Sequence, residues 1–280
     1  EPTPDCRAGS CNQCGACDHR TVRTIIAPAD APVGTVISSF AGRDGNELRE
    51  KAFRLRFTKL GQARFLSHLE LSAALSRAMI LGGLSFIYSQ GFHPHPKISF
   101  AGATSVGMES KGEFADIRIQ EPAEDIGPLV ARINAALPSG VAITAMRELP
   151  ANAFSLAELV MGFDYDLVLP EDVGEAELVR IETGISRFLD AESFGVVREV
   201  KGKPIIKEIR PHVTGLSLDR PSRRILLSAR FGPKGTVRPA EILTGVIGFS
   251  AEASLRIGVV KTATRLADFA EATDREILGT

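Results

Sequence analysis

Long apolar runs are missing from this sequence of 280 residues. No stretch approaches the roughly 18 apolar residues that a membrane-spanning helix needs, and the N-terminus lacks the basic region followed by an apolar segment that marks a secretory signal. A large net charge is also missing, because 33 Lys and Arg stand against 34 Asp and Glu. The total charge therefore does not require a nucleic-acid partner, and we expect a cytoplasmic globular protein long enough for two modest domains.

Cysteine is absent after residue 17, which excludes disulfides between distant parts of the chain. The four cysteines are Cys6, Cys11, Cys14 and Cys17. Their C-x4-C-x2-C-x2-C spacing lets the thiolates surround one centre, and zinc and a [4Fe–4S] cluster both suit such ligands. The alternative is a disordered cysteine-rich tail or a chance set of reactive thiols. We expect a metal-binding segment at residues 1–20.

Another absence concerns catalysis: the chain lacks the C-x3-C-x2-C arrangement that holds the cluster of a radical S-adenosylmethionine (SAM) enzyme. That catalytic core is therefore not in this chain. The sequence begins with "EPTPDC", which has the character of the middle of a polypeptide, so we expect a fragment of a longer protein.

Residues 51–150 show the periodicities of an α+β domain. After a linker at 21–50, "FRLRFTKL" alternates apolar and basic residues, as a strand with one wet face does. Ser67 and Glu70 form a capping box ahead of a helix that Gly82 ends. Further strands at 97–101, 113–119 and 141–149 and a helix from Pro122 give the order β-α-β-β-α-β, which predicts a ferredoxin-like fold.

The same order is predicted again at 160–265. Strands are expected at 163–169, 194–200, 224–231 and 255–264, with helices at 174–189 and from Pro239. The segment 201–219 is an insertion in this scheme, and 266–280 is a C-terminal tail. We therefore expect two tandem ferredoxin-like domains behind a cysteine-rich segment.

Charge is segregated along the chain although its total is near zero. Bases dominate 51–100 and 198–238, and acids dominate 113–192. If the two basic segments face each other, they form a positive groove for a polyanion such as RNA. The alternative is a set of scattered, solvated faces.

The stretch "YSQGFHPHPKISFAG", residues 88–102, holds two histidines that each precede a proline. A metal site at His93 and His95 would need further ligands, but no acid or thiol lies close to them in the sequence. As general acid or base, either imidazole has a suitable intrinsic pKa. As a binding loop, the stretch offers Tyr88 and Phe92 for stacking and Lys97 for charge. The remaining alternative is a stiff connection with no further role; we favour binding.

A second basic histidine-proline loop, "KGKPIIKEIRPHV", follows in the other half. Its Lys207, Arg210 and His212 repeat the chemistry of the first loop. We interpret the pair as two contact loops on one RNA.

Three stretches together resemble the radical-SAM-linked family of uncharacterised bacterial proteins. They are "FRLRFTKLGQARFLSHLELSAALSRA", "YSQGFHPHPKISFAGATSVGMESKGEFADI" and "IIKEIRPHV", and the resemblance covers roughly residues 51–262. In addition, "PTPDCRAGSCNQCGACD" resembles the C-terminal cysteine segment of the radical SAM partner. Lys261 is a departure, since the family pattern leads us to expect arginine there.

The resemblance implies a partner, in the same chain or a separate one, that binds SAM and cobalamin. Genes of this family lie near those for an RNA-processing ribonuclease and ribosomal proteins, so ribosomal or transfer RNA is the substrate class that it implies. We therefore expect an RNA-recognition module for a radical SAM enzyme. The alternatives are an RNA-cleaving enzyme that uses His93 or His95, and a protein-interaction scaffold. The expected RNA contacts are Arg54, Arg56, Lys59, Tyr88, Phe92, His93, His95, Lys97, Lys207, Arg210 and His212.

Overall fold

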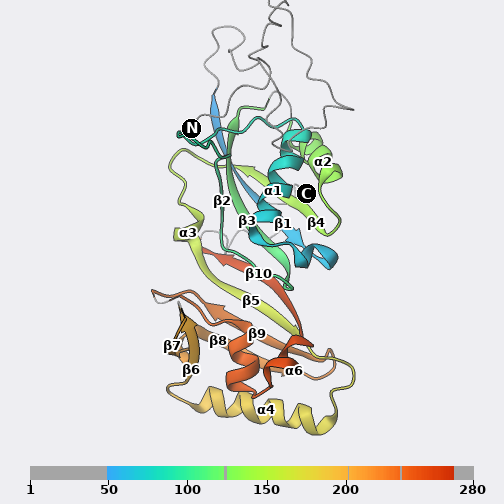
Figure 1. Ribbon diagram of the computed structural model, residues 1–280, viewed down its shortest axis with the longest axis vertical. Coiled ribbons are helices and arrows are strands. Elements are labelled where there is room, and N and C mark those ends of the chain that lie inside the picture. The colour runs from blue at the N-terminus through green and yellow to red at the C-terminus, as the bar shows by residue number, and fades with distance from the viewer. Residues whose placement is uncertain (1–48, 123–124, 201, 234, 268–280) are drawn as a thin grey trace, which may run out of the picture. The chain divides into compact units, whose positions relative to one another are not determined.

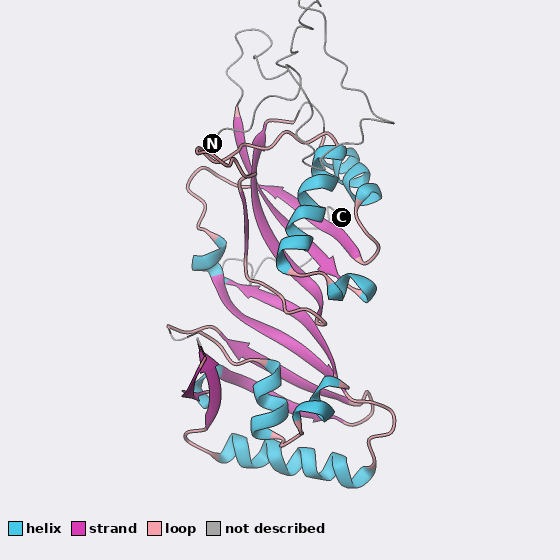
Figure 2. Ribbon diagram, viewed as in Figure 1, coloured by secondary structure: helices cyan, strands magenta, loops and turns pink. Residues whose placement is uncertain are grey.

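The alternation of apolar and polar residues after residue 50 builds the first strand of a large sheet. Phe53, Leu55 and Phe57 turn inward from it and are buried. The computed structural model describes residues 49–122, 125–200, 202–233 and 235–267. These residues form a mixed α+β fold with a mostly antiparallel sheet (Figures 1 and 2), which confirms the expected class.

The elements follow one another in two successive sets. The first set is β1 (Glu50–Lys59), the 3-10 turn η1 (Gly61–Phe65), α1 (His68–Leu81), β2 (Ile98–Phe100), β3 (Glu109–Gln120), α2 (Ile126–Ala136) and β4 (Val141–Glu148). The second set is α3 (Leu156–Leu159), β5 (Val160–Val168), α4 (Glu175–Asp190), β6 (Gly195–Val200), β7 (Lys203–Glu208), η2 (Arg210–His212), β8 (Val213–Asp219), β9 (Arg224–Arg230), α5 (Pro239–Glu241), the π-helical turn η3 (Ile242–Val246), α6 (Ala251–Leu255) and β10 (Gly258–Leu266).

Helix α1 begins and ends where the sequence predicts. The amide of Glu70 donates to the Ser67 hydroxyl at 3.3 Å, and the Glu70 carboxylate accepts from the Ser67 amide at 2.8 Å. The amides of Ser67 and Glu70, which the start of a helix leaves without backbone partners, are thereby hydrogen-bonded. At the other end, Gly82 caps the helix and Gly83 takes a positive φ of 102°. The predicted capping box is confirmed.

One sheet runs through both sets of elements. Its order is β4-β1-β3-β10-β5-β9-β8, and β2 pairs with β3 beside this path. The two sets meet where β10 runs parallel to β3, with Lys261 opposite Ser110, while the other pairings are antiparallel. Residues distant in sequence are thus neighbours at the β3–β10 seam.

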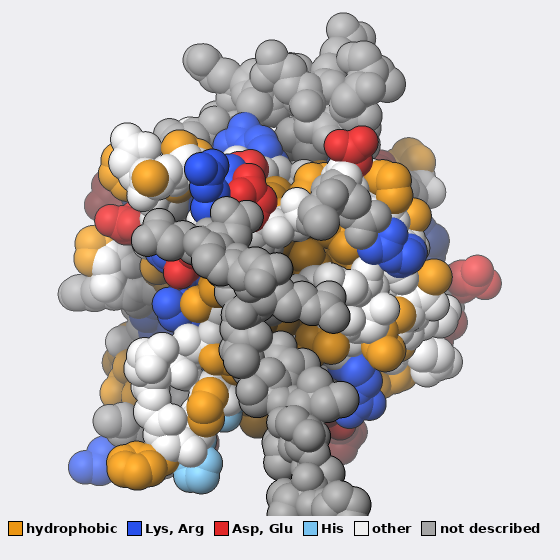
Figure 3. Space-filling view, turned by 90° about the horizontal axis from the view of Figure 1, so that it is seen from above, with side chains coloured by type: hydrophobic (Ala, Val, Ile, Leu, Met, Phe, Trp, Pro, Cys, Tyr) orange, Lys and Arg blue, Asp and Glu red, His pale blue; other side chains and the backbone are white. Residues whose placement is uncertain are grey.

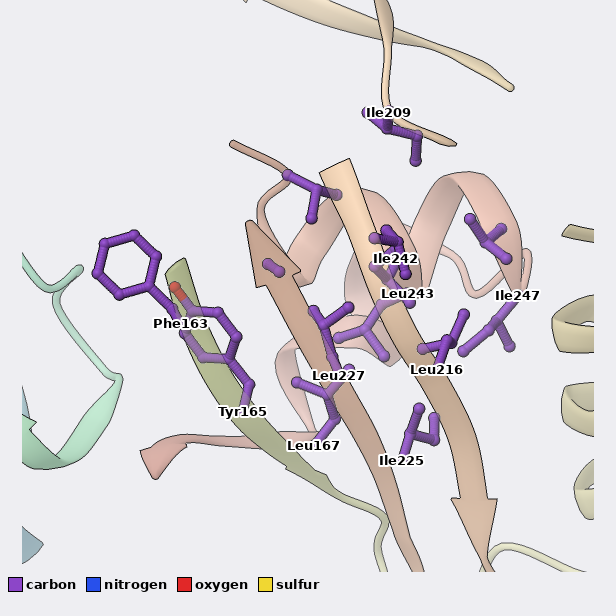
Figure 4. Close-up of a cluster of buried hydrophobic side chains, with 14 of the residues drawn as sticks. Phe163, Tyr165, Leu167, Ile209, Leu216, Ile225, Leu227, Ile242, Leu243 and Ile247 are labelled. Carbon is purple, nitrogen blue, oxygen red and sulfur yellow. The ribbon is translucent and has the colours of Figure 1, made fainter. Parts of the chain in front are cut away.

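Each set has its own hydrophobic core. One core lies between α1, α2 and β1, β3 and β4, and includes Phe57, Leu75 and Ile117. The other involves α4, η3, β5, β8 and β9. Figure 4 shows part of the second core, where Phe163 and Tyr165 project from β5 beside the cluster around Leu227. Because each set of elements packs around its own core, each half of the sequence has its own pattern of apolar residues.

The strand assignments of the second half need one correction. The expected sheet strand 194–200 forms β6, which pairs only with β7 in a separate two-stranded sheet. The edge of the main sheet is β8, which lies within the segment expected to be an insertion. The physical reason is burial: β8 places both Val213 and Leu216 in the core, whereas β6 buries Val196 alone and leaves Val197 75% exposed.

The expected division into domains at 51–150 and 160–265 stays a prediction, and one sheet runs through the described residues of both ranges. The cysteine-rich segment 1–20 lies outside the described residues. So do most of the linker 21–50 and most of the tail 266–280.

Gly140 offers a test of the packing between β1 and β4. It has a φ of +90°, and a Cβ there would lie 2.0 Å from the Leu60 carbonyl oxygen. Gly61 also has a positive φ, of +56°, but its Cβ would meet nothing within 4 Å. We expect Gly61→Ala to lower the free energy of unfolding by about 1–2 kcal/mol and Gly140→Ala by about 2–5 kcal/mol. Urea denaturation measures both, and equal losses would contradict the described contact.

Candidate functional site

The histidine-proline stretch forms a short arm, residues 87–97, between α1 and β2. The Lys97 amide donates to the Ile87 carbonyl at 2.8 Å, and the Ser89 amide donates to the His95 carbonyl at 2.8 Å. The His95 amide in turn donates to the Ser89 hydroxyl at 3.0 Å. The arm is anchored to the sheet because Arg118 on β3 exchanges backbone hydrogen bonds with Ile87 and Lys97. These bonds fix the base of the arm and leave its tip projecting.

All five arm residues expected to contact RNA are exposed. Phe92 at the tip is fully exposed and Tyr88 is 40% exposed. His93, His95 and Lys97 are exposed as well. In Figure 3, histidine side chains lie at one corner of the visible face beside hydrophobic and basic side chains. Among the described residues, Phe92 is the most exposed of the large hydrophobic side chains.

A groove of about 870 Å³ begins at the base of the arm. Its basic side chains are Arg49, Lys51, Lys97 and Arg118, and its acidic ones are Glu50, Asp116 and Glu148. Some of these charges are paired with each other, since Lys51 contacts Glu148 at 2.5 Å and Arg118 contacts Glu50 at 2.8 Å. The Arg118 hydrogen bond lowers the pKa of the Glu50 carboxyl. The groove is therefore only mildly basic.

Two expected phosphate contacts of β1 are buried. The Arg54 guanidinium is 5% exposed, binds both oxygens of Asp116 at 2.7 and 2.9 Å, and donates to the Phe154 carbonyl. Lys59 is completely buried. Arg56, on the same strand, is half-buried. The alternation of β1 suggested a wet basic face, but β3 and the 149–155 segment cover Arg54.

The second histidine-proline loop has a structural role. Arg210 donates to the Leu189 and Ala191 carbonyls at 3.0 and 3.1 Å, where α4 ends, and lies over the Phe188 ring. It thus satisfies carbonyls that a helix end leaves free. Lys207, the second of the expected contacts, is buried. His212, the third, is half-buried, and its burial lowers the pKa of its imidazole.

Several described bases of the segment 198–238 are paired with carboxylates. Arg198 pairs with Glu241 at 2.6 Å, Arg224 with Asp166 at 2.8 Å, and Arg220 with Glu182 at 2.5 Å. These bases are used within the second half, which favours the alternative of separate charged faces over a groove between two basic segments.

A buried ionic cluster at the β3–β10 seam was not recognised in the sequence. The Lys261 ammonium contacts the Glu113 carboxylate at 2.6 Å and the Thr104 hydroxyl at 2.9 Å. Lys59 lies close by, with its ammonium 3.4 Å from the Thr104 and Ser105 carbonyls. The three charged side chains are each less than 5% exposed. Lys261 thus pairs directly with Glu113, and the charge of Glu113 also acts on the nearby Lys59 ammonium.

This arrangement perturbs the neighbouring titrations. Burial lowers the pKa of the Lys59 ammonium, Glu113 opposes this effect, and the charge of Lys261 reinforces it. Burial also raises the pKa of the Tyr165 phenol, and the charge of Glu113 adds to the rise. The Lys261 ammonium lies 5.2 Å from the centre of the Phe163 ring, which gives it a cation–π contact.

The expected metal ligands Cys6, Cys11, Cys14 and Cys17 lie outside the described residues. Within the ranges that the structure describes, no three His, Cys, Asp or Glu side chains are grouped so as to hold a metal ion. In the same ranges no helix is both long enough and apolar enough to cross a bilayer.

A family model described as "Uncharacterized protein conserved in bacteria (DUF2344)" matches residues 52–239. The chain belongs to this family. The match includes the arm and most of the groove lining, begins after Arg49, Glu50 and Lys51, and ends before β10, which carries Lys261. The expected kinship with an uncharacterised bacterial family is thereby confirmed, while the link to a radical SAM enzyme stays a prediction.

Comparison with known structures adds no functional information. A crystal structure of an unknown protein from Galdieria sulphuraria is 9% identical, with a TM-score of 0.23, over 78% of this chain and 99% of that one. No curated protein matches the sequence.

The buried cluster predicts an unequal response to substitution. Glu113→Gln leaves two buried ammonium groups without a counter-charge, and we expect a loss of about 3–5 kcal/mol in the free energy of unfolding. Lys59→Met leaves the Lys261–Glu113 pair balanced, so we expect a change within about 1 kcal/mol. Urea denaturation at neutral pH compares the two variants, and equal losses would contradict the assignment of Glu113 as the counter-charge of the cluster.

The pH dependence supplies a second measurement of the same variants. Because the pKa of Lys59 is lowered on folding, the unfolded state binds more protons between the folded pKa and the ordinary value of 10.5. The contribution of Lys59 to the free energy of unfolding therefore rises as the pH rises from its folded pKa to 10.5. Lys59→Met should lack this contribution to the rise.

Proposed function

We propose that the chain is a substrate-recognition module that binds RNA through the arm, residues 87–97, and the adjoining groove. The observation that carries the proposal is the full exposure of Phe92 at the tip of an arm whose base is fixed by backbone hydrogen bonds. An anchored arm loses little conformational entropy on binding. Its aromatic, imidazole and ammonium groups together offer the chemistry that RNA recognition uses.

Each arm residue has a role in this proposal. Phe92 and Tyr88 stack on bases, His93 and His95 donate hydrogen bonds, and Lys97 contacts phosphate. The phosphate backbone of the RNA would run past three arginines of the groove and its margin, Arg49, Arg56 and Arg118. Arg54, Lys59 and Arg210 are left out because their side chains serve the fold.

Single-stranded or looped RNA is the form of substrate that the arm favours. The major groove of an RNA duplex is too deep and narrow for side chains to read, so exposed aromatic residues act on unstacked bases. The mild charge of the groove points the same way, since phosphate contacts alone would need a stronger basic surface.

The association with a radical SAM enzyme is part of the proposal. In this account the partner supplies the reaction, and the present chain holds the RNA, ribosomal or transfer, for modification. The cysteine segment would lie at the junction, where four thiolates within twelve residues suit zinc or a [4Fe–4S] cluster.

We also propose that the two sets of elements descend from a ferredoxin-like repeat. The strand orders β4-β1-β3-β2 and β10-β5-β9-β8 support this view, because each places the first strand of its set between the last and the next-to-last. In the second set the β6–β7 hairpin would then be the insertion.

Replacement of Phe92 tests the RNA proposal. We expect Phe92→Ala to weaken binding of a fluorescein-labelled single-stranded RNA about fivefold to a hundredfold, because one stacked base contributes about 1–3 kcal/mol. Fluorescence anisotropy at about 50 and 200 mM salt gives the affinities, and binding should fall with salt. Leu69→Ala is the matched control, since Leu69 is 79% exposed on α1 and belongs neither to the arm nor to the lining of the groove.

Equal affinities of the Phe92→Ala variant and the unaltered chain would refute the assignment of the arm. Shortening of the RNA during the titration, abolished by His93→Ala or His95→Ala and independent of SAM, would favour the cleavage alternative instead. No binding of single-stranded or hairpin RNA at low salt would refute RNA recognition altogether.

Metal analysis tests the cysteine segment separately. After anaerobic purification, we expect the chain to retain about one zinc ion or one iron–sulfur cluster per molecule. Replacing Cys11 and Cys14 by serine should abolish it. Elemental analysis and the visible absorption spectrum distinguish the two metals. A metal content unchanged by these substitutions would contradict the assignment.

A further inference from the structure

A second cavity, distinct from the groove beside the arm, lies next to the buried ionic cluster. It has a volume of about 930 Å³, within the range of small-molecule sites. Residues 101–108, between β2 and β3, form one wall. β5, β10 and the segment around α5 and α6 supply the remainder.

Most of the lining is apolar. Phe163 of β5 lies at the margin of the second core, as Figure 4 shows, and Met108, Leu243 and Val259 add aliphatic surface. At the rim, apolar side chains stand in water: Val106 is 61% exposed, Phe231 49% and Leu255 85%. An exposed apolar rim around an apolar cavity favours entry of an apolar group.

The charged groups of the lining are all of one sign. Among its described residues, Lys261 and Arg238 are basic and none is a carboxylate. Glu113 lies behind Lys261 and pairs with it, and the Lys59 ammonium lies near the Thr104 and Ser105 carbonyls of the cavity wall. The ionisable side chains that line the cavity are therefore basic, and the nearest carboxylate stands behind Lys261.

Neutral polar groups are available for orientation. Thr236 lines the cavity, and its hydroxyl oxygen is buried without a hydrogen-bond partner among the described residues. A buried hydroxyl in this state carries a desolvation cost that a ligand group can relieve. Arg238 is exposed and supplies a cation near the mouth.

We propose that this cavity binds a small amphipathic anion, with its apolar body between Phe163 and Leu243 and its carboxylate or phosphate near Lys261 or Arg238. The basic side chains of the lining set the sign of the ligand, and its apolar side chains set the body of the ligand. The proposal is independent of RNA binding, because the cavity and the arm are lined by different residues.

A matched series of ligands tests the proposal on the 280-residue chain. Anilinonaphthalene sulfonate, a fluorescent apolar anion, serves as the probe, and decanoate, decanol and decylamine compete with it. The three competitors share one alkyl chain and differ in charge. We expect decanoate to displace the probe about tenfold better than decanol, as a charge-assisted hydrogen bond provides, and decylamine to displace it least.

Variants locate the binding. Leu255→Glu places a carboxylate at the mouth, and Arg238→Met removes a cation there. Each should weaken decanoate binding about fivefold or more and leave decanol binding within about twofold. Both side chains are exposed, so the fold should persist, which circular dichroism checks. Leu69→Glu adds the same charge to an exposed apolar site on α1 and should change neither affinity.

The proposal is supported if decanoate is favoured and the two mouth variants weaken it while Leu69→Glu does not. It is overturned if decanol or decylamine competes as well as decanoate, if none of the three displaces the probe, or if the mouth variants bind decanoate as the unaltered chain does.

Discussion

The buried ion pair between Lys261 and Glu113 is the constraint on which the junction between the two halves depends. Lys261 enters from β10 and Lys59 from β1, and the three groups meet where β3 and β10 run parallel. A buried ion pair seldom adds net stability, but its loss leaves a charge without a partner. The cluster therefore specifies which strands pair with each other more than it raises the free energy of unfolding.

The close approach of the two strands follows from small residues at the same seam. Gly112 leaves room for the β10 backbone, since a Cβ there would lie 3.3 Å from the Ala263 Cα atom. The Thr264 hydroxyl then donates to the Gly112 carbonyl at 2.6 Å. A short parallel strand pair has few backbone hydrogen bonds of its own. The side-chain hydrogen bond of Thr264 and the Lys261–Glu113 ion pair therefore add to the contacts that hold β3 and β10 together. The continuous sheet in turn holds the cavity wall at 101–108 beside β5.

Local features were predictable from sequence and distant pairings were not. The capping box of Ser67 and Glu70 is fixed by residues three apart, and the structure confirms it. Arg54 looked like part of a wet basic face because its partner Asp116 lies on another strand, in a register that the sequence alone does not reveal. The same reason hid the partnership of Lys59 with Glu113 and Lys261. For the sheet edge, alternation did not distinguish β6 from β8, since β6 buries Val196 alone whereas β8 buries both Val213 and Leu216.

The arm and the cavity differ in dielectric environment, and this difference decides what each can recognise. Charges on the exposed arm are screened by water and salt, so Lys97 contributes little by itself and discrimination has to come from stacking on Phe92 and Tyr88. At the cavity, Lys261 is 4% exposed, and its charge acts through a poorly polarisable medium. The arm therefore suits a large polyanion that gains from many weak contacts, whereas the cavity suits a small anion that gains from one strong contact.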